Sequence, residues 1–167
     1  MDLDPTDRAI LYLLQEENQT HLTHDEIGDR IDVSSSTVSN RLRELKDEGV
    51  LRDYRPEIDY EAAEIPHHLL FICTTPIADR ETICQRTVDV PGVVNVRELL
   101  TGSRNLHVEI VAMNTPEIEA VTEELDDLGL EIHQSEIVRG DYYQPFDQFG
   151  KVELESESES GSETESN

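Results

Sequence analysis

The chain has 167 residues, and 38 acidic residues against 13 basic ones give it a formal net charge of -25. No apolar run exceeds residues 69–73, whereas a membrane-spanning helix needs ~18 residues. The opening MDLDPTD also lacks the basic and then apolar layout of a signal peptide. We therefore expect a cytoplasmic protein with no membrane partner, built as one domain or two small ones.

The acidic residues are spread along the whole chain, and only two lysines, Lys46 and Lys151, accompany eleven arginines. This balance is typical of halophilic proteins, which work in multimolar intracellular salt. At ~1 M salt the Debye length is ~3 Å, so distant carboxylates no longer repel a phosphate and local charges decide. The alternative is an unusually acidic protein of ordinary cytosol, where self-repulsion would destabilise the fold.

The first two predicted helices have clear start signals. Asp4 is a helix cap, and Pro5 occupies the first helical position of a helix that we expect to reach about residue 17. Thr23 and Glu26 form the pattern of a capping box, which predicts a second helix over about residues 24–31.

A third helix is predicted over residues 35–47, after the capping residue Ser34 and before Gly49. Its apolar residues share one face at helical spacing, and they are Val38, Leu42 and Leu45. Residues 50–59 look extended, with an interruption at Pro56.

The second and third helices have the spacing of a helix-turn-helix, whose second helix lies in the major groove of DNA. Gly28 would let the two helices approach closely. Asp32 stands where many such motifs have glycine, and Asp tolerates left-handed geometry better than most residues.

The outward face of the third helix carries side chains that suit base edges. At about 100° per residue, Ser36, Asn40 and Arg43 point away from the apolar stripe. Asn binds adenine and Arg binds guanine through two hydrogen bonds, and hydroxyls serve base or phosphate. The predicted contacts with double-stranded DNA are Ser36, Thr37, Ser39, Asn40, Arg41 and Arg43. The alternative is an amphipathic helix whose polar face only meets water.

The local charge of this helix is favourable although that of the whole chain is not. Residues 35–46 hold Arg41, Arg43 and Lys46 against Glu44, a net charge of +2. Each phosphate contact loses ~0.9 log units of affinity per tenfold rise in salt, so base contacts must contribute more at molar salt.

Residues 67–139 change to the alternating and continuous apolar patterns of strands. Their order predicts the ferredoxin-like βαββαβ unit, and hence an α+β protein. The expected elements are a strand at 69–75, a helix at 79–88, strands at 93–100 and 106–112, a helix at 115–128 and a strand at 130–138.

We expect a DNA-binding domain with a connecting strand at 1–60, a ligand-sensing and oligomerisation domain at 61–150 and a disordered acidic tail at 151–167. The tail serines, which stand beside glutamates, are either phosphorylation sites or part of a solubilising segment. Four aromatic residues precede the tail and are expected to pack on the sheet or at a subunit interface: Tyr142, Tyr143, Phe146 and Phe149.

No sequence motif indicates catalysis, a cofactor or a bound metal: GxxxxGK, GxSxG and paired metal motifs do not occur. Cys73 and Cys84 lie in apolar surroundings, which favours reduced, packed thiols over a redox role. A metal sensor using strand histidines is an alternative, but His67 and His68 would point to opposite faces.

Three segments together resemble the Lrp/AsnC (feast/famine) family of transcriptional regulators, in a haloarchaeal-like form, over about residues 2–139. They are LDPTDRAIL, DEIGDRIDVSSSTVSNRLRELKDEGVLRDY and VPGVVNVRELLTGSRN. The resemblance implies a winged helix-turn-helix followed by a ferredoxin-like effector domain. It also implies a homodimer, with octamers as a further assembly, and an amino acid as the small-molecule effector.

By that resemblance, the turn formed by Gly102, Ser103, Arg104 and Asn105 would meet the effector. The family usually has an acidic residue where Asn105 stands, so binding of an ammonium group would lose a charge here. Arg104 would instead favour a carboxylate or another anion. The alternative for this segment is a plain solvated turn. The alternative for the whole protein is an enzyme, since sirohaem decarboxylases share this pair of folds. Arg52, Tyr54 and Arg55 are expected either to touch the DNA backbone or to bridge protomers.

Overall fold

The computed structural model describes residues 2–16, 22–52, 55–76, 78, 80–100 and 102–150. The chain divides into two compact units, each with its own core. The first unit comprises Met1–Glu57 and Tyr142–Asn167, and the second comprises Ile58–Asp141. Residue 17, Tyr54 and the acidic tail, on which three of the predictions fall, lie outside the described residues.

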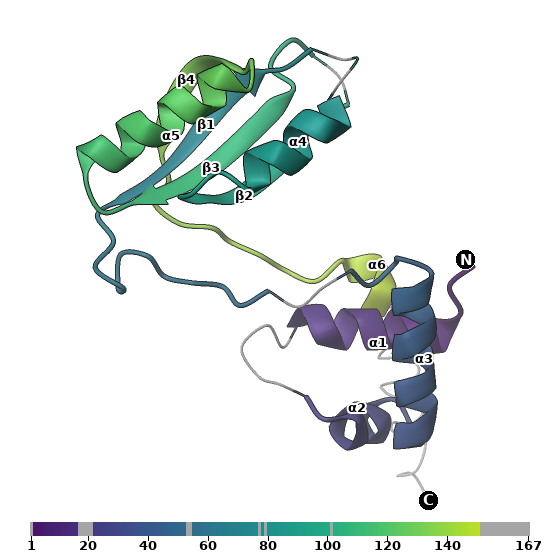
Figure 1. Ribbon diagram of the computed structural model, residues 1–167. Coiled ribbons are helices and arrows are strands. Elements are labelled where there is room, and N and C mark those ends of the chain that lie inside the picture. The colour runs from purple at the N-terminus through teal and green to yellow at the C-terminus, as the bar shows by residue number, and fades with distance from the viewer. Residues whose placement is uncertain are drawn as a thin grey trace, which may run out of the picture. The chain divides into compact units, whose positions relative to one another are not determined.

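The first unit is helical, and its elements are α1 (Pro5–Glu16), α2 (His24–Arg30), α3 (Ser35–Asp47) and the short α6 (Asp147–Gly150) (Figure 1). The predicted start of α2 is confirmed, because Thr23 and Glu26 form a complete capping box. The start of α3 is confirmed as well, since the Ser34 hydroxyl accepts the N–H of Thr37.

The core of the first unit joins the apolar faces of α1, α2 and α3. The predicted stripe of α3 is buried, as are Ile27 of α2 and Ile10 of α1. Helix α3 ends as expected, because Gly49 adopts φ +70 and the N–H of Leu51 donates to the carbonyl of Leu45. The buried stripe therefore leaves the opposite face of α3 free for other contacts.

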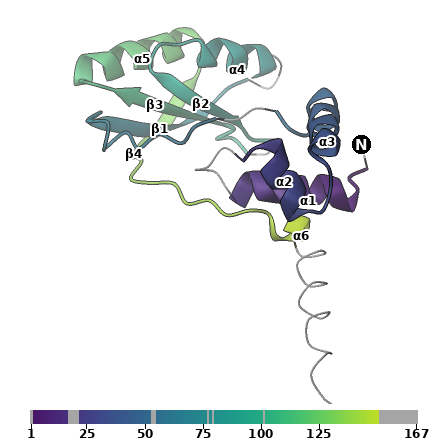
Figure 2. The ribbon, with the colours of Figure 1, turned by 90° about the horizontal axis from the view of Figure 1, so that it is seen from below.

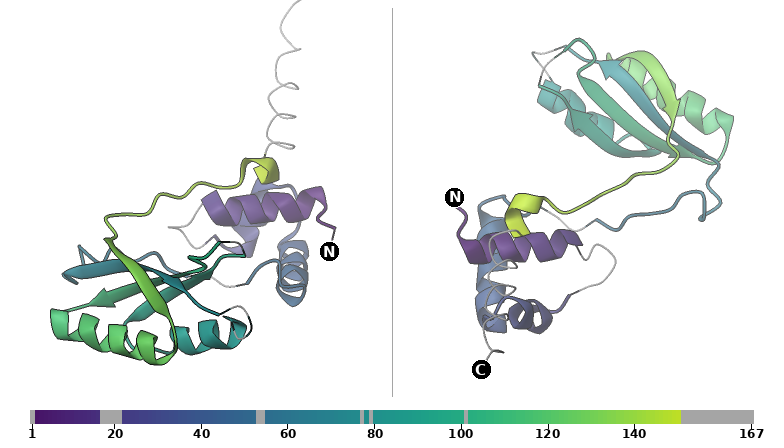
Figure 3. Two further views of the ribbon diagram at one scale, coloured as in Figure 1. Left: turned by 90° about the horizontal axis from the view of Figure 1, so that it is seen from above. Right: turned by 180° about the vertical axis from the view of Figure 1, so that it is seen from behind.

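The end of the described chain, from Tyr142 onward, belongs to the first unit. The sequence pattern had predicted one domain over residues 61–150. Helix α6 lies against α1 (Figure 3). Phe149 packs on the helical core, and the N–H of Phe146 donates to Gln15 Oε1 at 2.8 Å. The rings of Phe146 and Phe149 meet edge-on with centroids 5.0 Å apart, whereas Tyr142 is 99 % exposed.

The second unit contains a four-stranded antiparallel sheet in the order β2-β3-β1-β4, which confirms the ferredoxin-like prediction. Its strands are β1 (His67–Thr74), β2 (Val93–Glu98), β3 (Leu106–Ala112) and β4 (Glu131–Ile137). Helices α4 (Arg80–Val88) and α5 (Thr115–Asp127) cover the same face of the sheet (Figure 2).

Alternation along the strands builds the core of the second unit. Leu69, Phe71 and Cys73 of β1 are buried beside Val108 and Ile110 of β3. The neighbouring positions along both strands, which are only half-buried, form the other face of the sheet.

The expected connecting strand does not form in the described residues 50–52 and 55–66. A strand is defined by hydrogen bonds to a partner, and Pro56 has no N–H to donate. Instead, residues 60–64 make a turn, in which Ile65 N–H donates to the Tyr60 carbonyl. Within the described part of the chain, no helix is long and apolar enough to cross a membrane.

Candidate nucleic-acid interface

The turn between α2 and α3 is tight and leaves no space at Gly28. A Cβ atom at this position would lie 2.5 Å from the carbonyl oxygen of Val33. The N–H of Val33 donates to the carbonyl of Gly28 at 3.0 Å. Asp32 takes the left-handed conformation with φ 55, as its place in the motif predicted. Gly28 and Asp32 together set the approach of α3 to α2.

Hydroxyl groups gather at the start of α3. The Oγ of Ser34 lies 2.9 Å from that of Ser36 and 2.8 Å from Oγ1 of Thr37. Ser36 is exposed, whereas Thr37 and Ser39 are half-buried. Several hydroxyls at the start of a helix suit phosphate or base acceptors.

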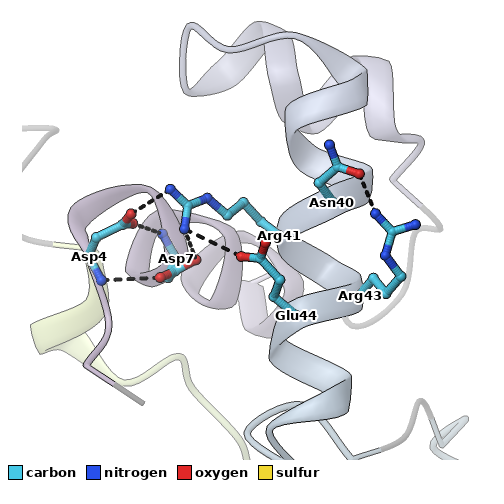
Figure 4. Close-up of polar contacts among 6 residues, drawn as sticks. All are labelled: Asp4, Asp7, Asn40, Arg41, Arg43 and Glu44. Carbon is cyan, nitrogen blue, oxygen red and sulfur yellow. Dashed lines mark hydrogen bonds and ion pairs between the residues drawn. The ribbon is translucent and has the colours of Figure 1, made fainter.

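Asn40 and Arg43 stand together on the outward face, where both are exposed (Figure 4). A guanidinium nitrogen of Arg43 donates to Oδ1 of Asn40. This contact aligns an amide donor and a forked cation along one side of the helix. Once this contact opens, each group can bind a base edge bidentately, adenine for Asn and guanine for Arg.

Arg41, one of the predicted DNA contacts, does not lie on this face. Its guanidinium points toward α1, where it pairs with Asp4 and Asp7, and it also pairs with Glu44 of its own helix (Figure 4). The local charge of +2 therefore overstates what the outward face offers, because these carboxylates offset Arg41.

In the second unit, Asn105, one of the predicted effector contacts, is only 3 % exposed. Its Nδ2 donates to the carbonyl of Thr75, and its Oδ1 accepts the N–H of the same residue. The side chain of Asn105 therefore joins the end of β1 to the start of β3, and its burial keeps both amide atoms away from a ligand in solvent.

The other three residues of the turn, Gly102, Ser103 and Arg104, are exposed. A guanidinium nitrogen of Arg104 donates to Oε1 of Gln134 on β4 at 3.3 Å. The carbonyl of Ser103 accepts the hydroxyl of Thr74. The turn therefore has one accessible cation, Arg104, and one accessible hydroxyl, Ser103. Arg104 lies beside the edge strand β4.

A polar network that the sequence analysis missed lies on the half-buried face of the sheet. His68 Nε2 is 2.6 Å from Glu109 Oε1, and Asn95 Nδ2 donates to Glu109 Oε2 at 3.2 Å. The ring of Tyr60 meets the His68 ring edge-on, and burial, with a smaller effect of Glu109, raises the pKa of Tyr60. The pairing register of the strands, which cannot be read from the sequence alone, brings His68, Asn95 and Glu109 together.

The two cysteines and the histidines show no reactive arrangement in the described residues. Cys73 is fully buried, and burial raises its pKa to about 12, so its thiol stays protonated at neutral pH. Burial also raises the pKa of Cys84. In the part of the chain that the structure describes, no three His, Cys, Asp or Glu residues are grouped to hold a metal ion.

The first unit has the arrangement of a helix-turn-helix DNA-binding domain, and the second has that of a ferredoxin-like domain. Residues 3–52 match the family described as winged helix-turn-helix DNA-binding. An uncharacterised HTH-type transcriptional regulator of Pyrococcus abyssi is 31 % identical over 120 residues, which cover 71 % of this chain and 73 % of the relative.

The leucine-responsive regulatory protein of Rhizobium meliloti is 27 % identical over 119 residues, which are 68 % of this chain and 73 % of the relative. Among solved structures, a transcriptional regulator of Neisseria meningitidis in complex with L-Met has the same fold, with a TM-score of 0.63 at 23 % identity. That match covers 86 % of this chain and 94 % of the other. The chain belongs to the Lrp/AsnC family of helix-turn-helix transcriptional regulators.

Membership of this family decides between the functional classes that the sequence had left open. The relatives are transcriptional regulators with a DNA-binding helix-turn-helix. The chain is therefore a regulator, and the alternative of a decarboxylase-like enzyme is not supported.

Proposed function

We propose that this regulator reads DNA sequence with the outward face of α3. The contacts with base edges and phosphates come from Ser36, Thr37, Ser39, Asn40 and Arg43. The observation that carries this proposal is the exposed Asn40–Arg43 pair, which stands opposite the buried stripe of the same helix. Major-groove readout needs a helix that is buried on one face and carries, on the other, side chains able to make two hydrogen bonds to one base.

The acidity of the chain fits this function if the protein works in the cytoplasm of a salt-loaded cell. In concentrated salt the many carboxylates are screened beyond ~3 Å, and phosphate contacts contribute little because counterion release is weak. Hydrogen bonds to base edges must then supply most of the affinity. An α3 surface with several hydroxyls, one amide and few cations matches that requirement.

The second unit responds to a small molecule, an amino acid in this proposal, at the turn of Gly102, Ser103 and Arg104. The regulator of similar fold from Neisseria meningitidis was solved with L-Met, which supports this ligand class. Arg104 is exposed and provides a cation for a carboxylate. The Asn105 side chain is buried against Thr75, so in this proposal backbone carbonyls of the turn bind the ammonium group.

The active assembly in this proposal is a homodimer, which forms octamers as the higher assembly. A two-fold dimer predicts an operator with two half-sites one or more helical turns apart, and higher assemblies would bend or wrap the DNA.

Selection of duplexes from a random pool in molar KCl, with and without each of the twenty amino acids, tests both parts of the proposal. We expect enrichment of a paired half-site motif and a change in its recovery with at least one amino acid. A parallel thermal-shift series tests the ligand alone. Absence of a response to all twenty would remove the amino-acid sensor and leave DNA readout untouched.

A further inference from the structure

Three carboxylates from two helices surround the guanidinium of Arg41. Its Nη2 lies 2.8 Å from Asp4 Oδ2, and its Nη1 lies 3.8 Å from Asp7 Oδ1 and 3.6 Å from Glu44 Oε2 (Figure 4). Asp4 and Asp7 stand at the start of α1, whereas Arg41 and Glu44 belong to α3. The two nitrogens of one planar group thus connect the two helices.

The carboxylate of Asp7 depends on this contact. Its side chain is 1 % exposed; Oδ2 accepts the N–H of Asp4 at 3.1 Å, while the buried Oδ1 accepts no hydrogen bond. Arg41 Nη1 is the cationic group that the described structure places beside this oxygen. A buried carboxylate without a compensating charge is strongly unfavourable, so the position of Arg41 is constrained.

The direction of Arg41 separates it from the reading face. At about 100° per residue, Arg41 lies roughly 60° from Val38 at the centre of the buried stripe. It lies roughly 100° from Asn40 and 160° from Arg43 around the same helix. An apolar stripe alone tolerates small rotations of a helix about its axis, whereas an ion pair at the side of the stripe resists them.

We propose that Arg41 is a positioning residue, which fixes the rotation of α3 against the start of α1 and so sets the direction in which Asn40 and Arg43 face DNA. This inference rests on the proposed readout by α3. Asp4 and Asp7 are the partners through which Arg41 acts, and none of the three touches DNA.

Neutralising the partner carboxylates distinguishes this role from simple electrostatics, because the two accounts predict opposite signs. Removing a negative charge should strengthen binding to a polyanion, but removing a positioning contact should weaken it. Asp4 caps α1, because its Oδ1 accepts the N–H of Asp7 at 2.8 Å. Asn is as good a helix cap as Asp, so Asp4→Asn keeps this cap. Asp7→Asn is the second variant, and Asp2→Asn, exposed and outside the network, is the control for loss of charge.

The probe is a duplex that the unaltered protein selects from the random pool, at the lowest salt at which every variant is folded by circular dichroism. We expect Asp4→Asn and Asp7→Asn to bind it roughly tenfold more weakly, while Asp2→Asn binds equally or more tightly. Equal or tighter binding by Asp4→Asn would overturn the inference, even if Asp7→Asn failed to fold. If the unaltered protein selects no duplex, the proposed readout fails and the inference falls with it.

The salt dependence of Arg41→Met supplies a readout that neither a phosphate contact nor a purely structural role would reproduce. Loss of a phosphate contact reduces the slope of log affinity against log salt by ~0.9. A positioning role predicts weaker binding with an unchanged slope, and partial rescue in Arg41→Lys, which keeps the charge without the fork. A reduced slope, or full affinity in the folded Arg41→Met protein, would contradict it.

Discussion

Asn105 and Thr75 exchange two hydrogen bonds inside the second unit. The Thr75 N–H donates to Asn105 Oδ1 at 2.9 Å, and Asn105 Nδ2 donates to the Thr75 carbonyl at 3.0 Å. Both residues are buried. An amide offers a donor and an acceptor side by side, whereas a carboxylate offers only acceptors. Asn105 therefore has a structural role, in which it holds the end of β1 against the start of β3.

Replacement of this amide by the acid typical of the family should destabilise the protein. In Asn105→Asp the carboxylate would face the Thr75 carbonyl without a donor, and we expect the free energy of unfolding to fall by roughly 2–3 kcal/mol at pH 7. Burial would raise the pKa of the new carboxyl above its unfolded value. The deficit should therefore shrink as the pH falls through that raised pKa, where the protonated acid can donate. Urea unfolding beside the unaltered protein at pH 7 and pH 5 measures this, and equal stability at pH 7 would refute it.

The elements were predictable because their signals are local. Thr23 with Glu26, and Ser34 with Thr37, form their caps within one turn of chain. The contacts of Arg41 and Asn105 were not predictable. Asp4 and Thr75 lie far from them in sequence, and only tertiary packing brings each pair together. Helical periodicity shows which side of α3 faces outward, but it does not show which residues of α1 pair with Arg41.

Gly28 should be the most sensitive glycine of the helix-turn-helix. Gly28→Ala brings a Cβ within 2.5 Å of a backbone oxygen that cannot rotate away, so we expect a loss of roughly 3 kcal/mol and weaker DNA binding. Gly49→Ala is the matched control. It meets no atom within 4 Å and pays only for its φ of +70, roughly 1–2 kcal/mol. Thermal unfolding of the two variants gives the comparison, and a smaller loss for Gly28→Ala would contradict the close approach.

Truncation of the reading pair should relax sequence preference. Asn40→Ala and Arg43→Ala each remove a side chain that can make two hydrogen bonds to one base, and we expect about 1–3 kcal/mol less discrimination at one base position. Arg86→Ala removes the same charge as Arg43→Ala, from an exposed arginine of α4 in the second unit, and serves as its control. Repeating the random-pool selection in molar KCl with each variant tests this. Motifs that are identical in all three proteins would remove Asn40 and Arg43 from base readout.

Cys73 should be unreactive in the folded protein. Its pKa of about 12 leaves almost no thiolate at pH 8, and its side chain is fully buried. We expect a thiol reagent to label a Cys84→Ala variant only after denaturation. Above the ordinary pKa of 9.0 the unfolded thiol ionises first, so this group's contribution to stability is lost as the pH rises from 9.0 toward 12. Rapid labelling of the folded variant at pH 8 would contradict this burial.

The central claim is that a few outward groups on α3 suffice for specific DNA binding by a chain of net charge -25. The most direct test measures affinity for a selected duplex and for a scrambled duplex of equal length, from about 0.5 M to about 3 M KCl. The account predicts that the scrambled duplex is lost first and that a preference for the selected duplex persists at molar salt. Equal affinities throughout, or no binding of either duplex wherever the protein is folded, would contradict it.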